Sequence, residues 1–165
     1  MSHAITGVIL KGRFSPEVVQ SFDLRPIDLG FDLTLFAMTH YYTACWQAKL
    51  GLDAELPGEK PQDLIFLREM AIAHIMIAIA PDPAPMFAVI ETDYFGGAGS
   101  QWALVYRGKQ LADTHVTQIS PALQILGIQC QEGLDEFDTV GLSQYRSLPL
   151  DHLDQYIDLA DELGI

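Results

Sequence analysis

The residues best suited to chemistry lie in one stretch, ETDYFGGAGSQ, in which two acids precede a glycine-rich turn. Glu91 and Asp93 are two positions apart, so on a strand their carboxyl groups share a face and lie close enough to couple. Paired carboxylates can divide the roles of general acid and general base, or can hold a cation, here together with Gln101. We take Glu91, Asp93, Tyr94 and Gln101 as the candidate binding residues and assign no catalytic residue and no metal ligand.

A structural role explains the two acids without any chemistry. Asp93 would accept hydrogen bonds from the N–H groups of the following turn, and Glu91 would form an ion pair with Arg107. Both arrangements would compensate the charge of a carboxylate that is withdrawn from water. Between the two interpretations we favour the structural one.

The glycines of the turn, Gly96, Gly97 and Gly99, invite comparison with a phosphate-binding loop. Such a loop requires a helix to follow it, and the residues that follow here, QWALVYR, predict a strand. We therefore do not expect nucleotide binding. The glycines are predicted to supply positive φ angles or a close backbone approach in a turn of about six residues.

No other complete catalytic or metal-binding motif is present in the sequence. The five histidines show no HxxxH, HxH or HExxH spacing, and we expect His74, within an apolar run, to be a buried core residue. Ser100 lacks the GxSxG pattern of a nucleophilic serine. Cys45 and Cys130 are far apart without a CxxC motif, so we expect two buried thiols and no disulfide framework, zinc site or other cofactor.

These candidate residues are positioned by a predicted β-hairpin, Met86 to Arg107. Large apolar side chains occur on both faces of its two strands, so the hairpin is expected in the middle of a sheet. A further strand is predicted from Ala4 to Lys11, where Gly7 suits a close approach of another backbone. Residues 24–38 predict two strand segments that join at a bend.

Helices are predicted between and after these strands. Thr39 can cap a helix that ends at Gly51, and the apolar residues up to Ala80 predict a buried helix that begins near Asp63. Residues 110–119 predict one more strand. Three more segments predict helices, namely 120–127, 134–140 and 150–163. The mixed order of strands and helices indicates a single α+β domain, residues 1–165, with a mainly antiparallel sheet covered by helices.

The charge of the chain is its most informative global property. The sequence has 22 acidic and 9 basic residues, a formal net charge of −13, with 49% hydrophobic residues. Such a surface repels phosphate backbones and favours a basic protein partner, so we expect neither nucleic-acid nor membrane binding. The amino terminus lacks the features of a secretory signal, and the most apolar run is too short to span a bilayer, so a cytoplasmic location is expected.

The segment ETDYFGGAGSQ, followed by an alternating strand, the run ALQILGI and the run DEFDTVGLSQYR, resembles a group of uncharacterised bacterial proteins. These proteins carry a similar acid-aromatic-Gly-Gly-x-Gly-x-Gln stretch, and the resemblance covers mainly Ile90 to Arg146. The resemblance implies no catalytic residues, and it implies an immunity-type role of the kind that some members suggest.

Two functions of different classes remain after these observations. The first is a non-enzymatic, acidic binding protein, immunity-like toward a basic toxin such as a nuclease, which an acidic surface would attract. The second is a small-molecule or metal-dependent enzyme that uses Glu91 and Asp93. The surroundings of the two carboxylates decide between these two functions. If both carboxylates are hydrogen-bonded or ion-paired within the protein and lie away from any cleft, an enzyme is disfavoured.

Overall fold

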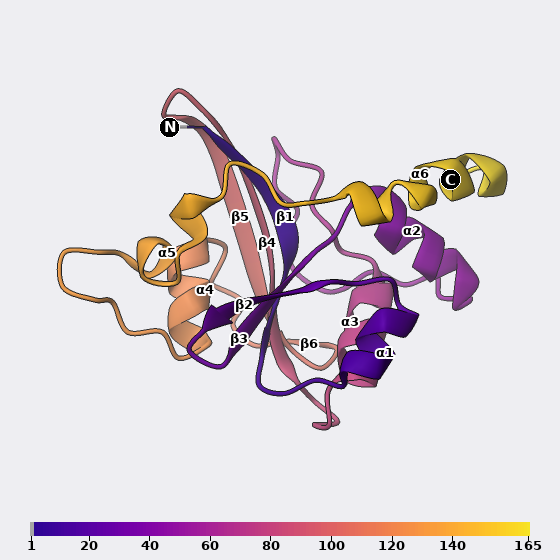
Figure 1. Ribbon diagram of the computed structural model, residues 1–165, viewed down its shortest axis with the longest axis horizontal. Coiled ribbons are helices and arrows are strands. Elements are labelled where there is room, and N and C mark those ends of the chain that lie inside the picture. The colour runs from indigo at the N-terminus through magenta and orange to yellow at the C-terminus, as the bar shows by residue number, and fades with distance from the viewer. Residues whose placement is uncertain (1) are drawn as a thin grey trace.

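The computed structural model describes residues 2–165, which form one six-stranded antiparallel sheet with helices on both faces (Figure 1). The order of strands across the sheet is β2-β3-β1-β4-β5-β6. The strands are β1 (His3–Lys11), β2 (Pro26–Gly30), β3 (Leu33–Ala37), β4 (Met86–Phe95), β5 (Ala98–Arg107) and β6 (Gln110–Leu111). The helices are α1 (Pro16–Ser21), α2 (His40–Lys49), α3 (Met70–Ile79), α4 (Ile119–Ile125), α5 (Glu136–Thr139) and α6 (Gln155–Leu163), with short 3-10 turns η1 (Leu142–Gln144) and η2 (Asp151–Leu153). The predicted α+β class, with a mainly antiparallel sheet covered by helices, is confirmed.

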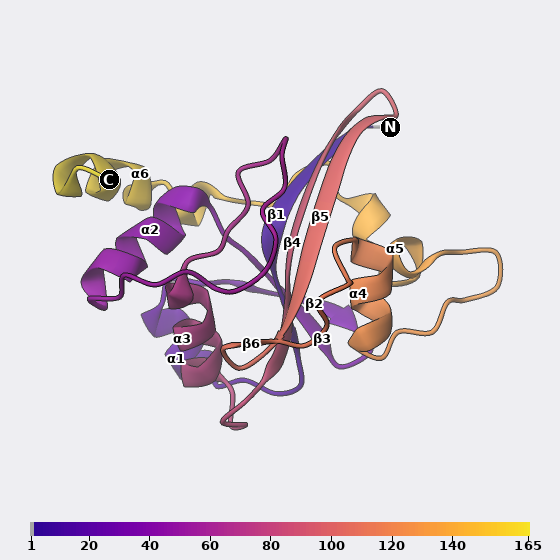
Figure 2. The same cartoon turned by 180° about the vertical axis from the view of Figure 1, so that it is seen from behind.

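Two hydrophobic clusters fill the spaces between the sheet and its helices. On one face, Phe87 of β4 packs in a cluster with Tyr42 of α2 and Tyr156 of α6, and α1 and α3 contribute to the same cluster. On the other face, Ile90 of β4 packs in a cluster with Leu123 of α4. The views from front and back show the sheet standing between α4 and α5 on one side and the remaining helices on the other (Figures 1 and 2). Successive side chains of β4 therefore enter different layers.

The hairpin of β4 and β5 occupies the middle of the sheet, as predicted. Its two strands pair continuously from Met86 opposite Arg107 to Phe95 opposite Ala98, and β4 pairs with β1 on its other side. A strand, and not a helix, follows the glycine turn, as expected from QWALVYR. The side chains of β4 alternate between the two clusters, which confirms the predicted division of its two faces.

Local sequence signals account for several of the element boundaries. Gly7 lies where β1 and β3 approach closely, because a Cβ atom at this position would lie 2.6 Å from the carbonyl oxygen of Phe36. This confirms the predicted reason for a glycine in β1. The predicted cap of α2 is also present, since Thr39 accepts a hydrogen bond from the N–H group of Tyr42, and Ser15 caps α1 in the same manner through the N–H group of Val18.

The helix predicted from Asp63 to Ala80 is wrong in its first third, because α3 begins only at Met70. The preceding residues are drawn into an antiparallel contact with the loop after α2, in which the N–H group of Leu56 donates to the carbonyl oxygen of Arg68. His74 is exposed, against expectation. The helix packs its apolar stripe on the sheet, and His74 lies outside that stripe.

Four other predictions require correction. The strand predicted over residues 110–119 is reduced to Gln110–Leu111, and residues 112–118 lead into α4 as a loop that keeps backbone hydrogen bonds to β5 at Ala112 and Thr117. The predicted last helix is divided into η2 and α6, and the helix predicted over 134–140 shortens to α5. Cys130 is an exposed thiol, whereas Cys45 is buried as predicted.

Candidate functional site: the Glu91 groove

The four predicted binding residues do not meet in one site. Glu91 and Asp93 project from β4 toward the side of the sheet that carries α2 and α3, whereas Tyr94 and Gln101 project to the opposite side. The register explains this division, because Gln101 lies opposite Thr92, which faces away from Glu91. The predicted cation site of Glu91, Asp93 and Gln101 is therefore not formed.

Among residues 2–165, no cationic side chain forms an ion pair with Glu91. The register places Arg107 opposite Met86 and Trp102 opposite Glu91, so the predicted ion pair between Glu91 and Arg107 is wrong. The Oε2 atom of Glu91 is buried and has no hydrogen-bond partner among residues 2–165. The pKa of Glu91 is raised from its ordinary value of 4.5 to about 7. Burial is the larger cause, and the nearby negative charge of Asp93 is the smaller one. The predicted coupling of the two carboxylates is thus present, with Glu91 as the perturbed member.

Asp93 is exposed, and its predicted hydrogen bonds from the turn are not formed. The N–H group of Gly96 instead donates to the hydroxyl of Ser2 at 3.4 Å. The turn is shorter than predicted, since Gly96 and Gly97 alone connect the strands, with φ angles of 60° and 85° that favour glycine. Gly99 is required for a different reason, because a Cβ atom there would lie 2.0 Å from the carbonyl oxygen of Asp93. The glycines therefore serve the backbone, as predicted.

Tyr94 and Gln101 connect the hairpin to the helices on the other face of the sheet. The amide nitrogen of Gln101 lies 3.3 Å from the hydroxyl of Tyr94, and its amide oxygen accepts a hydrogen bond from the N–H group of Ile119 at the start of α4. The ring of Tyr94 also lies against His3, with 4.9 Å between ring centroids. These contacts give both side chains structural partners.

The carboxyl group of Glu91 opens into a groove of about 380 Å³, which we call the Glu91 groove. It lies between β1, β4, the start of α2 and two loops. Its large apolar lining residues are Met38, Tyr41, Ile65, Leu67, Leu148 and Leu150. Three of these side chains are strongly exposed at its rim, with Tyr41 at 43%, Ile65 at 74% and Leu150 at 38%. An ionisable group at the base of an exposed apolar groove is a typical binding arrangement.

One wall of the groove is the segment 58–67, which we call the arch. It is fastened at both ends: the hydroxyl of Tyr106 donates to the carbonyl oxygen of Pro57 at 2.7 Å, and Arg68 donates to the carbonyl oxygen of Leu56 at 3.1 Å. Between these ends, no hydrogen bond joins the arch to any other described residue. The arch is held by apolar contacts of Phe66 and its neighbours, which makes it one of the less constrained parts of the fold.

The groove was not predictable from the sequence. Its residues come from β1, β4, α2, the arch and the loop after η1, and no local spacing unites them. The Nδ1 atom of His40, a residue that also lines the groove, lies 3.3 Å from the Oε1 atom of Glu69.

Outside the groove, hydrogen bonding to Glu136 raises the pKa of the exposed Cys130 thiol, so this cysteine is not activated as a nucleophile.

The structure and the comparisons add three findings. Among residues 2–165, no three His, Cys, Asp or Glu side chains come together as a possible metal site. None of the helices in that part of the chain has the length and apolar character needed to cross a membrane. Comparison of the chain with protein-family models, with curated proteins and with solved structures found no match. The site itself is therefore the basis on which a function can be inferred.

Proposed function

We propose that the protein is a non-enzymatic binding protein for a basic protein partner, and that a cationic side chain of this partner enters the Glu91 groove. The observation that carries the proposal is the buried carboxylate oxygen of Glu91, which has no partner among residues 2–165. Burial of an ionisable group without a partner is unfavourable, and a cation in the groove would relieve that cost.

The rim of the groove supports a protein partner in preference to a small cation. Tyr41, Ile65 and Leu150 surround the entrance with exposed apolar surface. In protein interfaces, a few aromatic and aliphatic anchors around a desolvated charged contact supply most of the affinity. A lysine or arginine would place its methylene groups against these side chains and its charge at Glu91.

The net charge of −13 supports a positively charged partner. An acidic surface accelerates the encounter with a basic protein and repels acidic competitors. An immunity-type inhibitor of a basic toxin in the bacterial cytoplasm is the form of this function that the sequence resemblance implies. Two free thiols, Cys45 and Cys130, are compatible with such a reducing compartment.

The test is affinity capture from the native cells, followed by measurement of the dissociation constant with the purified partner. The wild type is compared with Glu91→Lys and with Glu132→Lys, which makes the same charge change at an exposed position outside the groove. We expect a basic partner, a loss of about 100-fold in affinity for Glu91→Lys, and a change of less than about threefold for Glu132→Lys. Circular dichroism verifies that each variant is folded, and Glu91→Gln replaces Glu91→Lys if the lysine prevents folding.

An acidic or neutral partner would contradict the proposal. The same holds for equal effects of the two lysine variants, because these would show that only the total charge matters. Affinity that does not fall with added salt would also count against it, since the attraction is electrostatic.

An enzyme that uses Glu91 and Asp93 on a small molecule is the second candidate. It is favoured by one observation, the pKa of about 7 for Glu91, at which a carboxyl group exchanges protons efficiently near neutral pH. Turnover of nitrophenyl esters, phosphates or glycosides that titrates near this value and disappears in Glu91→Gln would support it. A Glu91→Gln variant with wild-type turnover would exclude Glu91 as the catalytic group.

A further inference from the structure

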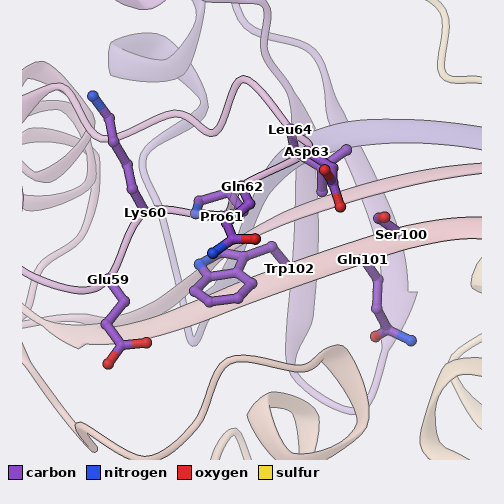
Figure 3. Close-up of a pocket in the computed structure, with 9 residues that line it drawn as sticks. All are labelled: Glu59, Lys60, Pro61, Gln62, Asp63, Leu64, Ser100, Gln101 and Trp102. Atoms are coloured by element: carbon purple, nitrogen blue, oxygen red, sulfur yellow. The ribbon is translucent and has the colours of Figure 1, made fainter.

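A second groove lies on the other side of the arch, between residues 59–64 and the first half of β5 (Figure 3). We call it the Trp102 groove. Its volume is about 370 Å³, within the range of sites that hold small organic ligands. Trp102 lies directly opposite Glu91 in the sheet, but the residues lining the two grooves are different. The two grooves therefore share the arch as a wall but have no lining residue in common.

The indole N–H group of Trp102 is an unused hydrogen-bond donor. The Nε1 atom is buried and has no acceptor among residues 2–165. Buried tryptophan N–H groups usually find a partner, because an indole nitrogen can only donate and loses its contact with water on burial. The other tryptophan of the chain has such a partner, since the indole N–H group of Trp46 donates to the hydroxyl of Tyr156 at 3.1 Å.

Six further polar side chains line the Trp102 groove, namely Glu59, Lys60, Gln62, Asp63, Ser100 and Gln101. Figure 3 shows the oxygens of Asp63 and Ser100 toward one end of the groove and the amide of Gln62 over the indole in this view. Lys60 extends away from these groups. The groove thus offers two carboxylate acceptors, a hydroxyl and two amides beside the ring of Trp102, whose N–H group is buried at the wall of the groove.

This combination selects the chemistry of the ligand. A phosphate or carboxylate would be repelled by Asp63 and by the net charge of −13. A simple cation would leave the N–H group of Trp102 without an acceptor. A ligand with several neutral hydroxyl groups can serve both the carboxylate of Asp63 and the N–H group of Trp102, because a hydroxyl can donate one hydrogen bond and accept another.

We propose that the Trp102 groove binds a neutral, polyhydroxylated ligand of about monosaccharide size, which donates to Asp63 and accepts from the indole N–H group of Trp102. The ring of Trp102 would provide an apolar surface for the C–H groups of the sugar. The arch can shift to admit the ligand, since its residues are not hydrogen-bonded to the remainder of the described chain. Movement of this segment would uncover the indole N–H group.

The test uses tryptophan fluorescence and titration calorimetry with a panel of hexoses, N-acetylhexosamines and linear polyols. Trp46→Phe leaves Trp102 as the single reporter, and Trp102→Phe is the matched variant that removes the proposed donor. We expect saturable binding by the wild type and by Trp46→Phe, and a loss of at least about tenfold in affinity for Trp102→Phe. Asp63→Asn, at an exposed loop residue, should weaken binding by about tenfold as well, whereas Asp53→Asn in the same loop should not.

The proposal is overturned if no member of the panel binds saturably up to about 100 mM, where even weak carbohydrate complexes form. It is equally overturned if binding survives unchanged in both Trp102→Phe and Asp63→Asn. Argininamide and lysinamide serve as cationic probes. If these bind at Asp63 and the sugars do not, the groove is a second contact for a cation. The Asp63 variant keeps the test decisive if Trp102→Phe fails to fold.

Discussion

Replacement of Glu91 by glutamine tests the electrostatics of the candidate site in the isolated protein, before any partner is known. Glutamine keeps the size and polarity of the side chain and removes its ionisation. If the surroundings of Glu91 disfavour its ionised form, the variant should be more stable than the wild type at every pH at which Glu91 is ionised.

The sign and size of the effect follow from the pKa. The folded state binds the proton of Glu91 with a pKa of about 7, whereas the ordinary value is 4.5, so the folded state holds the proton more tightly. The contribution of Glu91 to the free energy of unfolding therefore falls as the pH rises from about 4.5 to about 7, and it is constant above about pH 7. A pKa difference of about 2.5 corresponds to about 3.4 kcal/mol. Because Glu91 is only partly buried, screening by water reduces our expectation to about 1–2 kcal/mol.

The assay is urea unfolding of the wild type and of Glu91→Gln at about pH 5 and about pH 8. At the lower pH we expect only about a quarter of the full difference, because about pH 5 is just above the ordinary pKa of 4.5, and at the higher pH we expect Glu91→Gln to be more stable by about 1–2 kcal/mol. The difference between the two proteins removes the general effect of the acidic surface, which titrates in both. Glu132→Gln, at an exposed carboxylate, is the control and should show no such pH dependence.

A constant difference between Glu91→Gln and wild type at both pH values would refute the reasoning. It would show that Glu91 titrates alike in the folded and unfolded states, so that a cation in the groove would relieve no unfavourable charge. A less stable Glu91→Gln variant at the higher pH would point to an unrecognised partner of the carboxylate.

Other predictions address the partner and the fold. Affinity for the basic partner should be about tenfold weaker at about pH 6 than at about pH 8 in titration calorimetry, because a cation competes with the proton of Glu91, and this dependence should vanish in Glu91→Gln. Gly7→Ala should destabilise the protein by about 1–3 kcal/mol in urea unfolding, because the new methyl group meets backbone that cannot move aside. Tyr156→Phe should cost about 1.5–3 kcal/mol in the same measurement, since the hydroxyl donates to the carboxylate of Asp23 at 2.5 Å.

The elements of the sheet were predictable where a local rule determined them. The alternation of β4 and β5, the cap at Thr39 and the close approach at Gly7 each depend on residues near in sequence or on the geometry of one strand pair. The helix before Met70 was mispredicted because its first residues are held by a contact with Leu56, across a loop. Helical propensity is a weak preference that such tertiary contacts override.

The candidate site was predictable only in part. The sequence singled out Glu91 and its coupling to Asp93, since a spacing of two residues on a strand places both on one face. It could not reveal that Arg107 lies five positions away along the ladder, because register is determined by the turn, and the turn is two residues long and not six. The apolar rim of Tyr41, Ile65 and Leu150 is assembled from separate elements by the fold alone.

Glu91 and Trp102 are neighbours in the middle of the sheet, and each keeps a buried polar atom without a partner among residues 2–165. Such atoms lower the stability of the free protein, and a sequence adapted only for stability would replace them by apolar residues of similar size. Both lie beside the arch, the segment that lacks hydrogen bonds to the rest of the described chain. Unsatisfied groups next to a loosely held segment are the arrangement expected of a binding surface, where a ligand supplies the missing contacts and the segment adjusts to it. The middle of the hairpin is therefore a stronger candidate for function than its glycine turn, whose geometry is explained by the backbone.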